Sequence, residues 1–263
     1  MKFYDKDNKR LIVIEEKATN KFWDRHWEAK NFKKEIEKGK NSWFVKKNTN
    51  KFLKHGARVL EGGCGRGQIV YGLKHWGYDA YGVDFAEETV KKINENLPDL
   101  KVSFQDVRSL DFPDNFFDGY WSLGVIEHFT GGYEKIIEEA KRVIKTNGYL
   151  FLTFPHMFFL RRLKAKLGIY KKLDNDINNN FYCFILNEKE VAKNVEKHGF
   201  KLIFKKPFDA TKGLKDEIFL LKPILQKVYD SHNLLAKGIK FLNSFFLSKI
   251  AGHSILLVLK KRT

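Results

Sequence analysis

The sequence has few cysteines, no long apolar run and no internal repeat, and each absence excludes a class of protein. Two cysteines in 263 residues, Cys64 and Cys183, can form neither a disulfide scaffold nor a four-cysteine zinc site, and a reducing, cytoplasmic location is expected. The longest uncharged run, Thr146–Leu160, contains a proline and falls short of the ~20 residues that a membrane span needs. The charged start, Met1–Arg10, lacks the apolar stretch of a signal peptide, so none is predicted.

The chain is strongly basic, with a formal net charge of +17. Nucleic acid is an obvious candidate partner, but the excess lies entirely in the flanks, because residues 51–154 hold slightly more acidic than basic side chains. It is also mostly lysine, whereas base reading and bidentate phosphate recognition favour arginine. These features favour a solvated basic surface over a nucleic-acid interface. Binding of an anionic partner remains the alternative interpretation.

The centre of the chain alternates short apolar runs with amphipathic stretches. Five strands are predicted, at residues 57–61, 79–84, 101–105, 117–123 and 149–154. Helices are predicted between them, at residues 67–76, 86–96 and 133–144. This alternation indicates βαβ units and a parallel sheet with helices on both faces, which is a doubly wound α/β fold.

The pattern divides the chain into three parts. Residues 1–56 are expected to form a helical lid or cap, residues 57–154 a core, and residues 155–263 the rest of the sheet with two helical insertions, 155–186 and 207–252. In the first part, one helix is predicted over Asn20–Lys38. In the third part, we predict a helix at 187–198, strands at 201–206 and 254–260, helical structure within 216–250, and a polar loop at Asp174–Asn180.

A glycine-rich turn, GGCGRG at residues 62–67, joins the first core strand to its helix. Glycines there let backbone N–H groups approach a ligand, and ligands of open parallel sheets bind beyond the carboxyl ends of the strands. The spacing G-x-G-x-G lacks the third glycine of the dinucleotide fingerprint, and no G-x-x-x-x-G-K-[ST] loop is present. Asp84 and Asp106 follow the next two strands, where a carboxylate can accept hydrogen bonds from a ribose diol or an exocyclic amine.

Together these motifs resemble those of the class I S-adenosylmethionine-dependent methyltransferases, in particular the small-molecule branch called type 11. The matching pieces are VLEGGCGRG, YGVDFAEETVKKI, FQDVRSLDFPDNFFDGYWSLGVIEHF and EEAKRVIKTNGYLFLTFP, and more weakly FYCFILNEKEVAKNVEKHGFKLI. The resemblance implies a seven-stranded sheet of the Rossmann-like type whose last strand is antiparallel. It also implies S-adenosyl-L-methionine as cofactor and S-adenosyl-L-homocysteine as product, bound by the core at 57–154.

The resemblance also implies roles for individual residues. Glu61 and the loop residues Gly63, Cys64, Gly65 and Gly67 are expected to hold the methionine part of the cofactor. Asp84 is expected to bind the ribose hydroxyls. Asp106, Val107 and Phe85 are expected to contact the adenine, and Ser122 and Leu123 to lie beside the sulfonium.

Two histidines are candidate catalytic bases. His128 follows the fourth core strand and His156 follows the fifth, and a base is needed where the acceptor is a hydroxyl or a protonated amine. Glu127 and His128 match an E-H pair of the family, which in some relatives joins a further acid to bind a metal. Gly124 stands at that further position, so no metal site is predicted.

The flanking segments are expected to decide the acceptor. Trp23 and Trp27 suit a lid that excludes water. Met157–Lys172 and Leu220–Ile250 combine apolar and basic side chains, which suits contact with an amphipathic ligand or surface. The alternative for both segments is that they form lid helices packed at the mouth of the site. The combination of apolar and basic side chains favours a small or lipid-linked acceptor, including a glycan or phosphate-bearing intermediate, with peripheral membrane contact as one option. The alternatives are an RNA methyltransferase, a catalytically silent cofactor-binding scaffold and a nicotinamide oxidoreductase. The sequence leaves the oligomeric state open.

Overall fold

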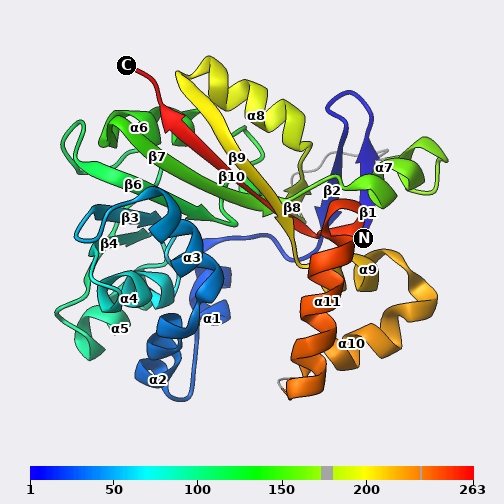
Figure 1. Ribbon diagram of the computed structural model, residues 1–263, viewed down its shortest axis with the longest axis horizontal. Helices are drawn as coiled ribbons and strands as arrows, with labels where there is room; N and C mark the ends of the chain where they lie inside the picture. Colours follow the sequence, from blue (N-terminus) through cyan, green and yellow to red (C-terminus); the bar gives the residue numbers. More distant parts are fainter. Residues whose placement is uncertain (173–179, 232) are drawn as a thin grey trace.

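A seven-stranded sheet forms the centre of the protein (Figure 1). The computed structural model describes residues 1–172, 180–231 and 233–263, so the loop predicted at Asp174–Asn180 lies, except for Asn180, outside the described residues. In spatial order, the strands are β5 (Lys101–Phe104), β4 (Asp79–Asp84), β3 (Arg58–Gly62), β6 (Phe117–Leu123), β7 (Ile144–Pro155), β10 (Ser254–Lys261) and β9 (Phe200–Phe208). The first five run parallel, and β10 runs antiparallel to both β7 and β9. The doubly wound α/β prediction, with its antiparallel last strand, is confirmed.

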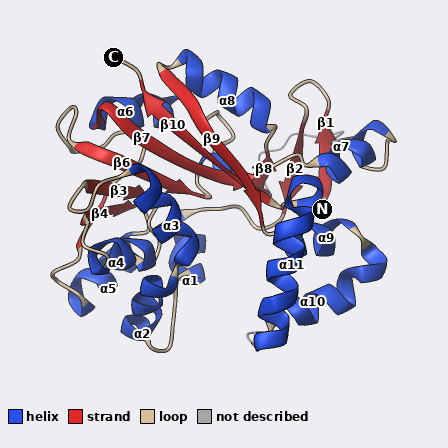
Figure 2. Cartoon of the chain, in the orientation of Figure 1, coloured by secondary structure: helices blue, strands red, loops and turns tan. Residues whose placement is uncertain are grey.

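Helices cover both faces of this sheet (Figure 2). On one face lie α3 (Trp43–Phe52), α4 (Gln68–His75) and α5 (Glu87–Asn96), and on the other lie α6 (Glu134–Val143) and α8 (Glu188–Lys197). Neighbouring strand residues serve opposite faces: Val59 packs in the cluster under α3 to α5, and Leu60 packs in the cluster under α6 and α8. This two-sided burial explains why the core strands are apolar throughout.

The first 56 residues differ from the predicted helical lid. Strands β1 (Lys2–Asp5) and β2 (Arg10–Ile14) form a hairpin, and β2 pairs with β8 (Phe181–Ile185) to make a second, three-stranded sheet. The single helix predicted over Asn20–Lys38 is wrong: the chain forms α1 (Asn20–His26), α2 (Phe32–Glu37) and a short 3-10 turn, η1 (Lys38–Asn41). The break arises because the Asn31 side chain accepts a hydrogen bond from the N–H of Lys34 and starts a new helix.

The remaining helices lie beside the second sheet, at the right of Figure 1. They are α7 (Phe159–Lys166), α9 (Ala210–Glu217), the 3-10 turn η4 (Phe219–Leu221), α10 (Lys222–Asp230) and α11 (Leu234–Ala251). Helices α10 and α11 both pack on α9. Across the described residues, no helix combines the length and the apolar character that crossing a membrane requires.

Candidate functional site

A cavity of about 1480 Å³ lies beyond the carboxyl ends of β3, β4 and β6. One end is lined by the glycine loop and by residues that follow β4 and β5. The other end is lined by the β1–β2 hairpin, β8, α9 and α10, including Lys2, Tyr182, Lys212 and Lys222. We call these the loop end and the lysine end. The cavity thus lies at the carboxyl edge of the parallel sheet, which is where ligands of such folds bind.

The glycine loop is fixed by bonds to the neighbouring strand. The N–H groups of Gly63 and Cys64 donate to the carbonyl of Val83, and the N–H of Gly65 donates to Oδ2 of Asp84 at 2.7 Å. Gly65 has φ +50°, and a Cβ at this position would lie 2.7 Å from the ring of Trp27. Both the backbone conformation and the close approach therefore require glycine.

Glu61, the next-to-last residue of β3, has a buried carboxyl group, one oxygen of which is unpaired within the described part of the chain. It is 3% exposed, and its Oε2 has no hydrogen-bond partner among the described residues. Burial, with the nearby Asp84, raises the pKa of Glu61 well above its ordinary value. Since Glu61 lines the loop end, a cationic or hydrogen-bond-donating ligand group would satisfy it there. The orphaned carboxylate and the glycine cradle thus fit the amino-acid part of S-adenosylmethionine.

Most of the other predicted cofactor residues also line the loop end, namely Gly63, Cys64, Gly65, Asp84, Phe85, Asp106, Val107 and Leu123. Asp106 is paired with Arg108, whose guanidinium donates to both carboxylate oxygens. Two predicted residues lie elsewhere. Ser122 is 1% exposed and does not line the cavity, and Gly67 starts α4 with φ +72° and packs against Leu100.

His128 lies at the middle of the cavity, in the short 3-10 turn η2 (Ile126–His128). Its Nδ1 lies 2.7 Å from the carbonyl of Tyr182. A carbonyl can only accept, so Nδ1 carries the proton and Nε2 presents a lone pair. Burial lowers the pKa of His128, which keeps the ring neutral at pH 7. The side chain is thus held in the form of an oriented base.

His156 occupies a different environment. It is 4% exposed, does not line the cavity, and lies with Nδ1 3.6 Å from Oε2 of Glu188. Burial lowers the pKa of its ring. The structure therefore brings His128 together with the predicted cofactor residues and leaves His156 apart from them.

Helix α1 and the residue after it bridge the loops of the cavity. The Trp27 carbonyl accepts from Nε of Arg66 at 2.6 Å, and Oδ1 of Asp24 accepts from both the N–H and the hydroxyl of Thr89. The ring of Trp23 meets the ring of His128 edge to face, with centroids 5.0 Å apart. This segment thus contacts the glycine loop, the start of α5 and the candidate base at once.

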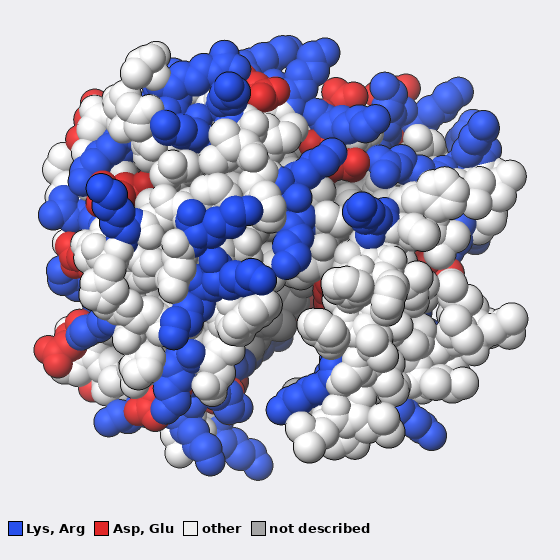
Figure 3. All heavy atoms as spheres, viewed as in Figure 1, with Lys and Arg blue, Asp and Glu red and all other residues white. Residues whose placement is uncertain are grey.

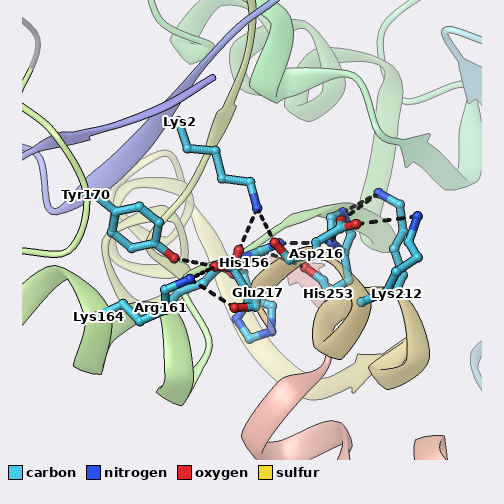
Figure 4. Close-up of polar contacts among 10 residues, drawn as sticks. Lys2, His156, Arg161, Lys164, Tyr170, Lys212, Asp216, Glu217 and His253 are labelled. Carbon is cyan, nitrogen blue, oxygen red and sulfur yellow. Dashed lines mark hydrogen bonds and ion pairs between the residues drawn. The ribbon is translucent and has the colours of Figure 1, made fainter. Parts of the chain in front are cut away.

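The lysine end is backed by a buried ion network (Figure 4). Glu217 accepts from Arg161 at 2.9 Å, from Lys2 at 2.6 Å and from Lys164 at 2.9 Å. Although burial opposes ionisation, Arg161 and Lys2 lower the pKa of Glu217 to about 2.

A second carboxylate, Asp216, lies near Lys212, Lys215 and His253. Burial lowers the pKa of His253 to about 3, so its ring is neutral. In the network the cations of Lys2, Arg161, Lys164, Lys212 and Lys215 share two carboxylates, which leaves an excess of positive charge.

Sequence reasoning missed several of these residues. Tyr182 falls in a segment that already matched the family, so its place beside the site could have been anticipated. Lys2, Glu217 and His253 come from segments that are distant along the chain, and no local pattern links them. Their association appears only once the hairpin, α9 and β10 are assembled.

Comparison with known proteins identifies chains to which this one is similar. The family model described as "Methyltransferase domain" matches residues 44–152. A 2-methyl-6-phytyl-1,4-hydroquinone methyltransferase from Synechocystis is 34% identical over 104 residues, which are 37% of this chain and 32% of that protein. An uncharacterized protein from Methanocaldococcus jannaschii is 29% identical over 149 residues, 56% of this chain and 65% of that protein. The matches thus span less than two thirds of either relative.

Among solved structures, a SAM-dependent methyltransferase from Methanosarcina mazei superimposes with a TM-score of 0.56. The alignment covers 82% of this chain and 97% of that one at 17% identity. At this identity the similarity establishes the shared fold.

Proposed function

We propose, from the premise that this chain belongs to the class I S-adenosylmethionine-dependent methyltransferases of the type 11 family, that it methylates an oxygen or nitrogen atom of a small or lipid-linked acceptor that carries an anionic group. The observation behind this proposal is the single cavity that joins the glycine loop, His128 and the lysine end. When bound, S-adenosylmethionine supplies an electrophilic methyl group on a sulfonium centre. The chain's own residues then have to bind the cofactor and the acceptor, orient them toward each other and deprotonate the acceptor.

The loop end holds the cofactor in this proposal. Glu61 accepts from the amino group, the glycine loop lets the methionine part lie close to the backbone, and Asp84 accepts from the ribose hydroxyls. Asp84 is already positioned by the N–H groups of Gly65 and Ala86, so its orientation is set before any ligand arrives. Such pre-orientation reduces the entropy lost on binding.

His128 acts as the base toward an acceptor hydroxyl. With the cofactor bound, its Nε2 would accept the proton that the acceptor hydroxyl loses, while the Tyr182 carbonyl holds Nδ1–H and stabilises the imidazolium. Trp23 and Trp27 cover the site and exclude water. His156 does not take this role in our proposal, because it lies off the cavity.

The lysine end selects the acceptor. Lys2, Lys212, Lys215 and Lys222 all line it. Burial raises the pKa of nearby Glu127 to about 8, so that this carboxyl is neutral at pH 7 and does not repel an anion. A phosphate or carboxylate on the acceptor would complete the charge balance of this end.

The test supplies S-adenosylmethionine labelled in its methyl group together with, in separate reactions, a total lipid extract, a pool of polar metabolites and total RNA. We expect label in anionic lipids or anionic small molecules, and loss of that label with the His128→Ala variant. Label in RNA would favour the RNA methyltransferase. Tight binding of S-adenosylhomocysteine without transfer to any pool would favour the silent scaffold.

A further inference from the structure

Helices α10 and α11 carry an unusual outer surface. Eleven large apolar side chains of η4, α10 and α11 are exposed, and several are more than two-thirds exposed, such as Leu234 at 87% and Phe245 at 72%. The set, which we call the outer apolar face, consists of Phe219, Leu220, Leu221, Ile224, Leu234, Leu235, Phe241, Leu242, Phe245, Phe246 and Ile250. Figure 3 shows this region, at the lower right, as an area with little charge.

The orientation of α11 is the reverse of that in an ordinary surface helix. Its packed side consists mostly of small and polar residues: Ser248 and Ala251 are buried, and the Asn243 amide donates to the Thr211 hydroxyl of α9. Leu247 is a large apolar side chain of α11 that packs inward. Its solvent side carries the phenylalanines and leucines. A water-exposed helix normally buries its apolar stripe, and large exposed apolar patches mark interaction surfaces. This face is therefore built for an apolar environment outside the chain.

The charges around the face indicate what covers it. Five lysines lie on α10 and α11, Lys222, Lys227, Lys237, Lys240 and Lys249, against a single acidic residue, Asp230. A second copy of the chain would bring these lysines against their counterparts, which is unfavourable. The eleven side chains of the face are only Leu, Ile and Phe, whereas the residues that dominate binding at protein interfaces are enriched in Trp, Tyr and Arg, with Leu under-represented. Apolar residues flanked by lysine are typical of helices that lie on anionic bilayers.

We infer that the outer apolar face seats the protein on the surface of a bilayer that contains anionic lipids. Phenylalanine and leucine side chains enter the acyl boundary, and the exposed Lys227, Lys237 and Lys249 reach the phosphate groups with their long side chains. Lys222 and Tyr229 of α10 also line the cavity, so the seated helices place the lysine end next to the lipid headgroups. The inference stands on the surface alone and does not require the proposed reaction.

The experiment measures co-sedimentation of the full chain with phosphatidylcholine vesicles, with and without phosphatidylglycerol. We expect binding that needs the anionic lipid and weakens with salt. The triple variant Phe241→Ser, Phe245→Ser, Phe246→Ser should bind at least about tenfold more weakly, because the apolar insertion is lost. The matched control is Trp43→Ser with Phe104→Ser, two exposed aromatics on α3 and β5, which should leave binding unchanged.

Two further measurements distinguish a loss of bilayer contact from a loss of the fold or of cofactor binding. Calorimetry with S-adenosylhomocysteine should give the same affinity for the triple variant and the wild type, which shows that the fold is intact and tests the cofactor site independently. Lys237→Gln with Lys249→Gln should reduce binding to anionic vesicles without altering the apolar residues. Vesicle binding that is absent, or equal in the triple variant, would overturn the inference. So would a wild-type dimer in sedimentation velocity that the triple variant loses, in the absence of vesicle binding.

Discussion

The two ends of the cavity are built in opposite ways. The loop end comes from consecutive strand–turn–helix units, and its geometry depends on backbone hydrogen bonds such as Gly63 to Val83 and Gly65 to Asp84. The lysine end comes from the N-terminal hairpin, α7, α9 and β10, and depends on ion pairs around Glu217. The first is assembled locally along the chain, and the second is assembled from distant segments. A change at the loop end should therefore alter cofactor binding, whereas a change in the ion network at the lysine end should alter stability and a change in its cavity-lining lysines should alter acceptor binding.

We expect the largest effect on activity from a change at His128, which lies between the two ends of the cavity. For an acceptor hydroxyl, His128→Ala should lower kcat by about 10²–10⁴ while cofactor affinity stays nearly unchanged. Because burial lowers the pKa of His128, the acid limb of the wild-type kcat/KM profile should lie below pH 6.5. His156→Ala serves as the comparison and should leave kcat within a few-fold. An equal loss in both variants would remove His128 from its role.

At the lysine end, Glu217→Gln should destabilise the protein by about 3–5 kcal/mol, since the change leaves Arg161 buried without its counter-charge. The folded pKa of Glu217 is depressed to about 2, so its contribution to the free energy of unfolding is present above pH 4.5 and lost as the pH falls toward 2. Denaturant titrations at several pH values measure this. A variant as stable as the wild type would mean that the network has little energetic role.

At the loop end, Asp84→Ala should weaken S-adenosylhomocysteine binding by about 1.5–3 kcal/mol, the range for hydrogen bonds to a charged group. Asp7→Ala, in the exposed turn of the hairpin, is the control and should bind as the wild type does. Isothermal calorimetry gives the affinity, and a melting curve gives the fold. An unchanged dissociation constant in folded Asp84→Ala would remove this carboxylate from the site.

The smallest effect is expected for a single lysine of the lysine end. Lys212→Gln should raise KM for an anionic acceptor by about 3- to 10-fold with little change in kcat, which is the signature of lost ground-state binding. Lys205→Gln, exposed on β9, should change neither parameter. If both variants behave alike, general surface charge rather than the lysine end attracts the acceptor.

The same contrast explains what the sequence could predict. The strands, the glycine turn and the two acids of the loop end are encoded in short patterns, because each lies within one βαβ unit. The β1–β2 hairpin has no such local signal, since its third partner, β8, is about 170 residues further along the chain. The predicted helix over Asn20–Lys38 failed for another reason: continuous helical spacing conceals a cap at Asn31. On α11 the apolar periodicity was real, but it does not say which side faces the protein.

Helix α1 carries a consequence for how the two ligands affect each other. Trp27 lies against Gly65 at one end of the cavity, and Trp23, one turn away, lies against His128. Any ligand that moves or orders this helix at one end changes the surface that the other ligand meets. Where a ligand at one end orders this helix, its affinity and that of the ligand at the other end are thermodynamically linked, and the factor by which the first ligand changes the affinity of the second equals the factor by which the second changes the affinity of the first.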